Sequence, residues 1–551
     1  MSSEEKESKG INKLEDLVGE FGPWQRNLFL ISFINLMPIS WQILVPTFFT
    51  PEIDHWCSPP PAYWNLTANQ WKSLAIPQIT SENNTVIYSS CLMYKTITDS
   101  PSEREYSNVT CTSWEYDNSF YASTIIDEWN LVCDKAWLQS VSTTISMAGV
   151  LVAVFISGQL ADRFGRRPVI LLGVVILLVA GIGCAFSPSF IVFNILRFLS
   201  TFGATFLTFS SYILMLESVS VKYRNILPLC SEFGWALGFI TLPAIAWFVG
   251  DWSNLQLAIT IPWIVLVIYW WFLPESLRWL LTQDKEKQAE RELKRALILN
   301  KKQVSNLEDV VKQLMNKANK EENDASRKKA TFVDLLLTPN MRKKTLNLYF
   351  IWFVLAFVYY GLSLNTNNLG GNPFLNFFIA GAVEFPSYGA SVFAIKYLGR
   401  RISGMSTMVI AGLACVLTIP IPDDLLSLRI TVSMIGKAFI SGAFGIMIVY
   451  SSEIFPTVVR NVGVGSSSTF ARIGSMVAPF AVKELGKVTN PRVPLGIFGG
   501  FSIFAGLLIL LLPETNNKPL SDTLEEGEDF GKKHSAKVSP LEKQIVFSTK
   551  L

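Results

Sequence analysis

The stretch at residues 158–167 reads Gly-Gln-Leu-Ala-Asp-Arg-Phe-Gly-Arg-Arg and separates two long apolar runs. A degraded copy, Lys-Tyr-Leu-Gly-Arg-Arg, stands at residues 396–401 between two further apolar runs. Two other landmarks recur in the same order: Glu217 with Arg224 returns as Glu453 with Arg460, and Pro274-Glu275-Ser276 returns as Pro513-Glu514-Thr515. Every copy lies roughly 235 residues after its original, and such self-similarity indicates a duplicated structure of two homologous halves.

Apolar runs account for most of the chain. Of its 551 residues, 50% are hydrophobic and only 17% are charged, whereas a soluble domain carries about 25% charged residues. About 20 apolar residues are needed to cross a bilayer as a helix. Twelve runs meet this need, at 27–49, 137–160, 168–187, 190–216, 226–249, 257–273, 345–366, 373–395, 402–421, 425–451, 461–483 and 493–512. The sequence therefore predicts an all-α membrane protein of twelve transmembrane helices.

The orientation of these helices follows from the basic residues of the short loops, which favour the cytoplasmic side. All of those loops lie on one side of the predicted topology; they carry Arg163, Arg166, Arg167, Lys222, Arg224, Lys396, Arg400, Arg401 and Arg460. The opposite short loops carry Asp251, Asp423 and Asp424. Both termini are therefore expected in the cytoplasm. The acidic start, without a basic region or cleavage site, predicts that the first run is a retained helix and not a signal peptide.

The long loop at 50–136 is then extracellular. It contains four of the seven cysteines, Cys57, Cys91, Cys111 and Cys133, which predict disulfides outside the cell but leave three pairings open. It also contains three glycosylation sequons, at Asn65, Asn83 and Asn108.

The predicted domain order follows directly. It consists of a cytoplasmic N-terminus (1–26), a first six-helix half (27–273), a cytoplasmic linker (274–344), a second six-helix half (345–512) and a cytoplasmic tail (513–551). Parallel repeats of this kind place a substrate site near the middle of the membrane, between the halves.

The stretch at 158–167 resembles the signature loop of the major facilitator superfamily. The resemblance implies that Gly158, Asp162, Arg163, Gly165, Arg166 and Arg167 help to latch the two halves in one conformation. Glycines allow helices to approach closely, and basic side chains suit an anionic lipid surface and helix ends.

A narrower resemblance covers nearly the whole chain. The segments 128–133, 274–280 and 455–461, together with the large cysteine-rich loop, resemble the organic cation, carnitine and organic anion transporter family. The segments 360–369 and 513–520 are similar to the carnitine branch and to invertebrate organic cation transporter-like proteins. The chain departs from the family in having four loop cysteines, where six are usual.

Charges inside membrane spans cost about 2.5–3.5 kcal/mol on insertion scales and mark functional positions. Five stand out here: Arg472, Glu384, Lys437, Glu232 and Arg197. In the resemblance, cation carriers have an acidic residue at the position of Arg472, whereas anion and carnitine carriers have arginine. A guanidinium binds a carboxylate well, so Arg472 is predicted to bind substrate. A structural pairing of Arg472 with Glu384 is the alternative. Glu384 and Lys437 are candidate substrate ligands too, with a structural role open for Lys437.

An onium group is bound by aromatic faces through cation–π contacts. Trp352 and Tyr359 share a helix face and match cavity positions of the cation carriers, Tyr360 adjoins them, Tyr388 lies one turn from Glu384, and Tyr212 fits the carnitine branch. These aromatic residues are predicted to line the site, although many aromatics in membrane helices only face lipid or core.

Glu217 and Glu453 lie at helix ends beside Arg224 and Arg460, and we expect gating ion pairs there. The chain has two histidines and lacks zinc-site spacing, a phosphate-binding loop and a nucleophile elbow, so enzyme chemistry and cofactors are not expected. The combined prediction is a plasma-membrane carrier of small organic ions, most concretely cations or zwitterions such as carnitine, working by alternating access with sodium or proton coupling as options. An organic anion exchanger is the alternative. No nucleic-acid partner is expected, and the oligomeric state is undetermined.

Overall fold

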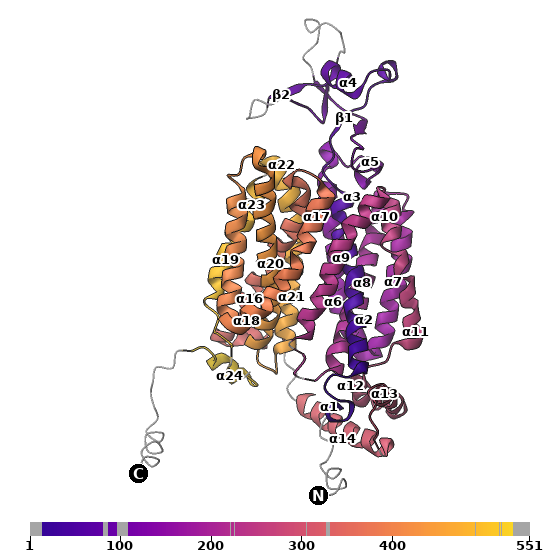
Figure 1. Ribbon diagram of the computed structural model, residues 1–551, viewed down its shortest axis with the longest axis vertical. Helices are drawn as coiled ribbons and strands as arrows, with labels where there is room; N and C mark the ends of the chain where they lie inside the picture. The colour runs from indigo at the N-terminus through magenta and orange to yellow at the C-terminus, as the bar shows by residue number, and fades with distance from the viewer. Residues whose placement is uncertain are drawn as a thin grey trace.

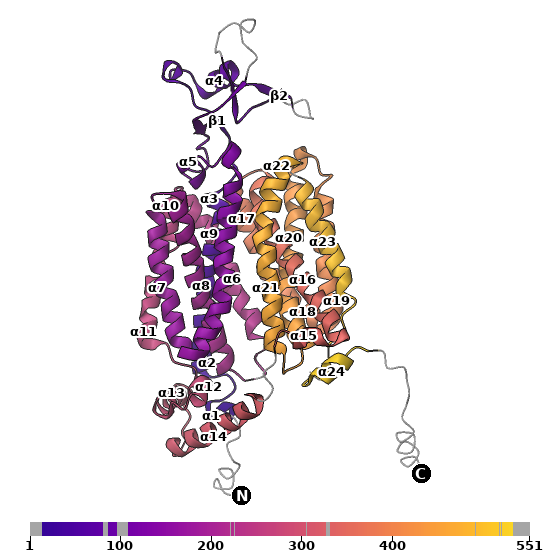
Figure 2. The same ribbon diagram turned by 180° about the vertical axis from the view of Figure 1, so that it is seen from behind.

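The computed structural model describes residues 14–80, 86–95, 108–220, 222–224, 226–304, 306–326, 331–490, 492–516, 518 and 521–532. Two helical bundles stand side by side, with the long first loop at one end and a set of short helices at the other (Figures 1 and 2). We refer to these as the first-loop end and the linker end.

The first half begins with α2 (Pro23–Leu44), which continues into the short α3 (Pro46–Phe49). Four long helices follow: α6 (Trp137–Phe164), α7 (Arg166–Ala185), α8 (Phe190–Ser218) and α9 (Leu227–Val249). The sixth span is irregular and consists of α10 (Trp252–Ala258), the 3₁₀ helix η5 (Ile261–Ile268) and α11 (Tyr269–Phe272).

The second half repeats this order. Its helices are α16 (Pro339–Leu364, followed by η6, Asn365–Leu369), the pair α17 (Pro373–Ala382) and α18 (Glu384–Leu398), α19 (Arg400–Thr418), α20 (Leu426–Ile454), α21 (Arg460–Phe480) and α23 (Val493–Ile509). A 3₁₀ turn, η7 (Asp423–Leu425), precedes α20. After α21 the chain forms a π-helical turn, η8 (Ala481–Leu485), and then α22 (Gly486–Val488).

Ten of the described helical stretches are long and apolar enough to cross a membrane. The shorter α23 and the more polar α21 pack in the same bundle, α23 against α19 and α21 against α16, and complete twelve. The eighth predicted run is broken at Val383 between α17 and α18.

Close helix packing depends on small residues, as is usual in membranes. A Cβ at Gly173 of α7 would lie 2.6 Å from the backbone nitrogen of Leu207, and one at Gly203 of α8 would lie 2.5 Å from that of Leu177. Glycine at these two positions therefore lets α7 and α8 pack backbone to backbone.

The first loop forms a small separate unit of three two-stranded antiparallel sheets. These pair β1 (His55–Cys57) with β6 (Trp114–Tyr116), β2 (Gln78–Thr80) with β3 (Val86–Tyr88), and β4 (Leu92–Tyr94) with β5 (Asn108–Thr110). Its short helices are η2 (Pro61–Tyr63), α4 (Ala68–Ala75), α5 (Ile125–Glu128) and η4 (Cys133–Lys135).

Two disulfides, Cys57–Cys111 and Cys91–Cys133, close this loop and decide among the three pairings left open by the sequence. Trp71 of α4 is buried within this loop, and its indole N–H donates to the carbonyl of Cys57 at 2.7 Å. The sequon residues Asn65 and Asn108 are exposed, whereas Asn83 lies outside the described residues.

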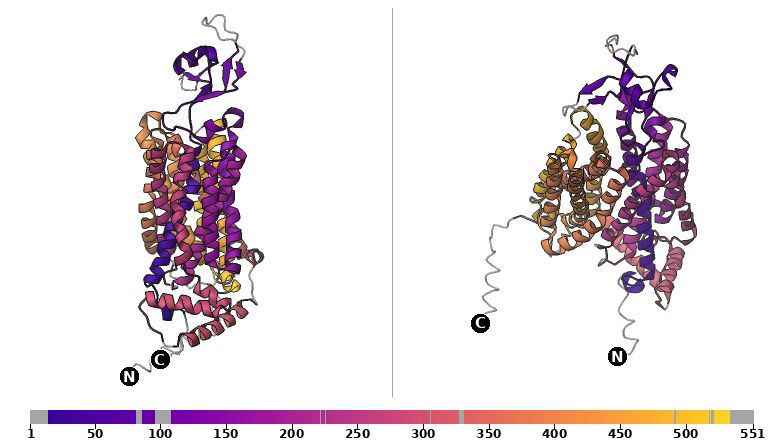
Figure 3. Two further views of the ribbon diagram at one scale, coloured as in Figure 1. Left: turned by 90° about the vertical axis from the view of Figure 1, so that its right-hand side faces the viewer. Right: turned by 45° about the horizontal axis from the view of Figure 1, so that its top comes forward.

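At the linker end lie α12 (Leu277–Thr282), α13 (Glu286–Leu299), α14 (Leu307–Ser326) and α15 (Asp334–Leu337), together with α1 (Leu14–Val18) and α24 (Leu524–Asp529) (Figure 3). One segment at this end caps the first helix of the first half, and another caps the first helix of the second half. The Asn300 side chain accepts a hydrogen bond from the Trp24 N–H of α2 at 2.9 Å. The Glu528 carboxylate accepts from the N–H groups of Asn340 and Met341 of α16 at 3.0 and 2.8 Å. This cap explains why α16 begins at Pro339, before the expected start at 345.

Candidate functional site

A cavity of about 160 Å³ lies between the two halves, a size that suits a small solute. Its walls come from α2, α6, α8 and α9 of the first half and from α16, α18, α20 and α21 of the second. The lining residues are Ser32, Leu36, Ile39, Ile43, Val154, Thr205, Thr208, Phe209, Tyr212, Ser231, Glu232, Trp235, Tyr359, Tyr360, Tyr388, Phe444 and Arg472. Five of the predicted site residues are therefore brought together: Arg472, Tyr359, Tyr360, Tyr388 and Tyr212.

Two charged side chains line this cavity, Arg472 from α21 and Glu232 from α9. In the described part of the chain neither of them forms an ion pair. The Nε atom of Arg472 is buried and has no hydrogen-bond partner there. The two groups lie within electrostatic range of each other. The cavity thus presents one basic and one acidic side chain, on opposite halves.

The aromatic residues give the cavity a largely apolar wall with hydroxyl groups. Trp235 of α9 donates its indole N–H to the Tyr359 hydroxyl of α16 at 2.8 Å, which joins the two halves at the cavity. Tyr359 stacks edge-on against Tyr360 at 5.1 Å and also packs against Phe444. These rings supply the faces that a cation–π contact requires.

Glu384 and Lys437 lie behind the Tyr359 side of this wall. They form an ion pair at 3.1 Å, and their side chains are 0% and 2% exposed. Glu384 also accepts hydrogen bonds from the hydroxyl groups of Tyr359 (2.6 Å), Ser441 (3.2 Å) and Tyr388 (3.4 Å). The alternative pairing of Glu384 with Arg472 is therefore not formed, because Lys437 takes that place. Neither Glu384 nor Lys437 lines the cavity, in contrast to their expected contact with substrate.

Trp352 also lies one layer back. Its indole N–H donates to the Ser451 hydroxyl at 2.9 Å, and its ring packs edge-on against Phe444, which does line the cavity. It shares a helix with Tyr359, as the spacing predicted, but it supports the wall and does not form it.

At the linker end of the first half, Arg166 is the centre of a charge cluster. Its guanidinium lies 2.7 Å from Glu217 and 2.8 Å from Asp162. Glu275 accepts hydrogen bonds from the backbone N–H groups of Arg166 (2.8 Å) and Arg167 (3.2 Å), which begin α7. A carboxylate is well placed at a helix N-terminus. Burial nevertheless raises the pKa of Glu275, against the effect of these hydrogen bonds.

The second half has a matching cluster. Arg400 pairs with Glu453 at 3.0 Å, and Glu514 accepts from the N–H groups of Arg400 and Arg401, each at 3.0 Å. Burial acts to raise the pKa of Glu514, but the hydrogen bonds from Arg400, Asn516 and Arg401 outweigh it and lower the pKa.

Both gating carboxylates form ion pairs, Glu217 with Arg166 and Glu453 with Arg400. Arg224 donates to the carbonyl of Val219 at 3.2 Å, and Arg460 to that of Phe455 at 3.3 Å. These two arginines therefore bind the carbonyls at a helix end.

The two glycines of the signature loop differ in how strongly the structure requires glycine at their position. Gly165 has a φ of +103°, and a Cβ there would collide with the Glu275 carboxylate. A Cβ at Gly158 would meet no atom within 4 Å, so close approach does not explain this glycine. Asp162 and Arg163 are exposed, and Arg163 lies over the Phe164 ring.

At the first-loop end, hydrogen bonds join the two halves. Lys483 of η8 donates to the backbone carbonyl of Thr50 at 2.6 Å and to the Gln139 side chain at 3.1 Å. Asn367 donates to the carbonyl of Thr47 at 2.9 Å, and Phe48 stacks on Phe374. In the described residues no ion pair joins the halves at the linker end. The structure is therefore closed on the first-loop side.

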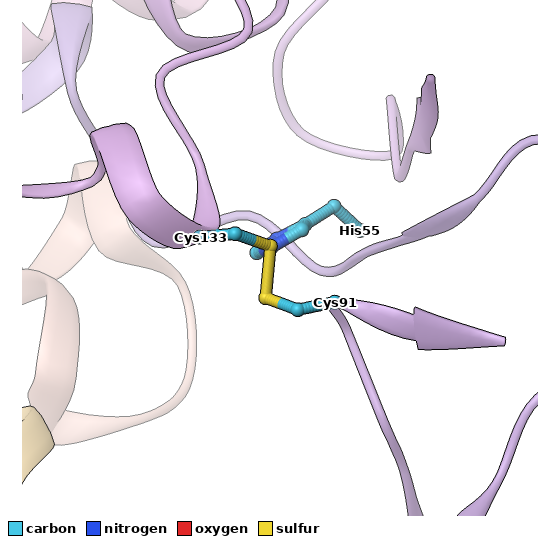
Figure 4. A group of neighbouring side chains, drawn as sticks. All are labelled: His55, Cys91 and Cys133. Atoms are coloured by element: carbon cyan, nitrogen blue, oxygen red, sulfur yellow. A yellow bond between two sulfur atoms is a disulfide. The ribbon is translucent and has the colours of Figure 1, made fainter. Parts of the chain in front are cut away.

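One group in the first loop has the composition of a metal site. His55 lies beside Cys91 and Cys133, with the ligand atoms within 4.8 Å of one another (Figure 4). The two sulfurs are bonded to each other, so they are not thiolate ligands. Burial lowers the pKa of His55, and its Nδ1 lies 3.1 Å from the carbonyl of Ile53.

A twelve-helix bundle of two repeats around a central cavity defines a membrane transporter of the major facilitator class. Residues 83–526 match the family described as Sugar (and other) transporter. The xylose transporter XylE from E. coli, in a partially occluded inward open conformation, has the same fold with a TM-score of 0.61 at 14% identity, covering 90% of this chain and 100% of that one.

Relatives that match over nearly the whole chain identify the branch of the family to which it belongs. The "Organic cation transporter protein" of Drosophila melanogaster is 38% identical, covering 94% of both chains. "Organic anion transporter 3" of Sus scrofa is 33% identical over 94% of this chain and 93% of its own. The chain belongs to the sugar (and other) transporter family, within its branch of organic cation and anion transporters. The predictions of family, all-α major facilitator fold, and organic ion transport in place of enzyme chemistry are confirmed.

Sequence reasoning gave no role to several residues of the site. Glu232 was one of the five charges within apolar runs, and the same signal that singled out Arg472 applied to it. Trp235 and Phe444 had no signal beyond their aromatic type. Glu275 and Glu514 stood in a visible repeat, but their contact with the helix that begins at Arg166 or Arg400 depends on tertiary structure.

Proposed function

We propose that this transporter carries small organic cations or zwitterions, carnitine being the concrete example, by alternating access. The observation that supports this most is the cavity itself, where the Arg472 guanidinium stands among tyrosine rings and forms no ion pair with any acidic residue that the structure describes. A zwitterion suits both features. Its carboxylate would bind Arg472 through charge-assisted hydrogen bonds, and its ammonium group would contact aromatic faces.

The transport cycle would exchange two sets of contacts between the halves. Opening on the first-loop side requires that Lys483 leave Thr50 and Gln139 and that Asn367 leave Thr47. The Trp235–Tyr359 hydrogen bond joins the halves at the cavity wall, so substrate binding there would act directly on the same movement.

Coupling and location belong to the same proposal. We place the protein in the plasma membrane with both termini in the cytoplasm, the first loop outside and its exposed sequons glycosylated. The basic loops at the linker end and the disulfides of the first loop favour this orientation. Transport would be facilitated or coupled to sodium or protons, since no nucleotide site is expected.

Organic anion exchange is the second candidate. It is favoured by one observation, that Arg472 is the cationic side chain lining the cavity, and by the relatives named as anion transporters. The two candidates differ in the charge of the solute that competes for transport.

The deciding experiment measures uptake of radiolabelled carnitine, tetraethylammonium and para-aminohippurate in expressing oocytes, with and without sodium. Carnitine or tetraethylammonium uptake is the expected result, and loss of uptake on sodium removal would identify sodium coupling. Uptake of para-aminohippurate alone would overturn the proposal in favour of anion exchange.

A further inference from the structure

We propose that Glu232 binds the ammonium group of a zwitterionic substrate whose carboxylate is held by Arg472, so that the bound substrate joins the two halves of the transporter. This inference rests on the proposed function and adds to it a specificity-determining carboxylate and a narrower substrate class.

Glu232 lies on α9 of the first half and lines the same small cavity as Arg472, which lies on α21 of the second half. A small solute that contacts both side chains therefore contacts both moving bodies. Binding energy gained in this way is available only while the halves hold the cavity closed around the solute.

The other acidic residue near the cavity, Glu384, is fully buried, paired with Lys437 and hydrogen-bonded by three hydroxyl groups. Its charge is already compensated by the protein. Glu232 has no ion pair in the described residues and faces the cavity, so its charge remains available to a ligand.

The charges of Arg472 and Glu232 together favour a substrate that carries both signs of charge. A lone anion bound at Arg472 would leave Glu232 unpaired in the closed cavity, and a lone cation at Glu232 would leave Arg472 unpaired. An unpaired charge shielded from water is costly. A molecule with one ammonium and one carboxylate group compensates both side chains at once and is therefore selected over either single ion.

The test compares apparent affinities of competitors in the same cells, because a ratio does not depend on how much transporter reaches the surface. Competitors of labelled carnitine are unlabelled carnitine, tetraethylammonium and para-aminohippurate. In Glu232→Gln we expect the affinity for carnitine relative to para-aminohippurate to fall by about 10- to 100-fold, since a hydrogen bond to a charged group is removed. Tetraethylammonium should weaken in the same direction.

Two further variants make the result decisive. Glu308→Gln makes the same substitution on α14 at the linker end, where the carboxylate pairs with Lys312 at 2.6 Å away from the cavity, and should leave the ratio unchanged. Glu232→Asp keeps the charge and should keep the preference for carnitine, and it serves as the test variant if Glu232→Gln gives no measurable uptake, since a preference lost in the aspartate variant would overturn the inference.

Failure of this inference can be distinguished from failure of the proposed function. If carnitine uptake depends on Arg472 but Glu232→Gln leaves the ratio as in the wild type, Glu232 does not bind the ammonium group and the proposed function still stands. If the wild-type protein takes up neither carnitine nor tetraethylammonium, the proposed function fails and this inference fails with it.

Discussion

In the first half, Glu275 accepts hydrogen bonds from the backbone of Arg166 and Arg167; in the second half, Glu514 does the same for Arg400 and Arg401. The agreement extends to the Arg166–Glu217 and Arg400–Glu453 ion pairs and to the helix-end carbonyls bound by Arg224 and Arg460. At the spacing that relates Glu217 to Glu453, however, Glu232 corresponds to Ser468 and Arg472 to Ala236.

The repeats thus agree where they hold their own helices together and differ where they face the cavity. The buried charges differ too: Arg197 of the first half is bound by the neutral side chains of Gln42 and Gln256, whereas Lys437 of the second half is paired with Glu384. Shared residues point to the scaffold of the fold, and the unshared charges that line the cavity, Glu232 and Arg472, point to the cargo. The following experiments, in order of decreasing expected effect, test this division.

Arg472→Ala should have the largest effect on transport. Loss of one partner of a desolvated, hydrogen-bonded charge pair costs about 2–5 kcal/mol, so the apparent affinity for carnitine should fall at least thirtyfold. Tetraethylammonium, which has no carboxylate, should lose much less. An equal loss for both solutes, at normal surface expression, would contradict the assignment of Arg472 to the carboxylate.

The linker-end clusters should respond to substitution in the same direction. Glu275→Gln and Glu514→Gln each weaken charge-assisted hydrogen bonds at a helix N-terminus, at a cost of up to about 1.5–3 kcal/mol in stability. Thermal unfolding of the purified protein should show the larger decrease for Glu514→Gln, because the pKa of Glu514 is lowered whereas that of Glu275 is raised, with the ratio of carnitine to para-aminohippurate affinity unchanged in both. A change in that ratio in either variant would show that the clusters contribute to cargo selection.

The aromatic wall is expected to matter less than the charges. Tyr359→Ala should weaken inhibition by tetraethylammonium by about 1–2 kcal/mol, because a desolvated cation–π contact is lost. Trp352→Ala, which removes a ring one layer behind the wall, should weaken it less. Dose–response curves for the two variants decide the order, and the reverse order would mean that the cavity reshapes when a cation binds.

The smallest effect concerns the caps of α2 and α16, which are neutral in the first half and charged in the second. Burial acts to raise the pKa of Glu528, but hydrogen bonds from the first turn of α16 outweigh it and lower the pKa to about 2. The unfolded value is about 4.3, so this cap stabilises the docked α24 fully above that pH and less as the pH falls toward 2. Hydrogen exchange in α24 should therefore increase on acidification, corrected for the intrinsic rate.

The Asn300 cap provides the internal control for that experiment. An amide does not titrate in this range, so exchange at the N-terminus of α2 should not change with it. An equal increase at both caps would indicate general loosening of the protein and not protonation of Glu528.

Much of the fold could be predicted from sequence because its signals are local. Run lengths, basic loops and the copies of residues 158–167 and 217–224 specified twelve helices in two halves. The site was harder. A charge within an apolar run identified Arg472 and Glu232 as positions of interest, but which charges pair with each other depends on helix rotation, as the Glu384–Lys437 pair shows. Helix spacing placed Trp352 and Tyr359 on one face without showing that only Tyr359 reaches the cavity.

The opposed charges of Glu232 and Arg472 also bear on how the membrane voltage acts on this carrier. A single charge moved across the bilayer exchanges about 2.3 kcal/mol with the field per 100 mV. A cavity whose charges sum to zero, loaded with a zwitterion whose charges also sum to zero, exchanges almost none. Turnover of such a complex would pass no current, and any current recorded during uptake would report the charge of a co-transported ion.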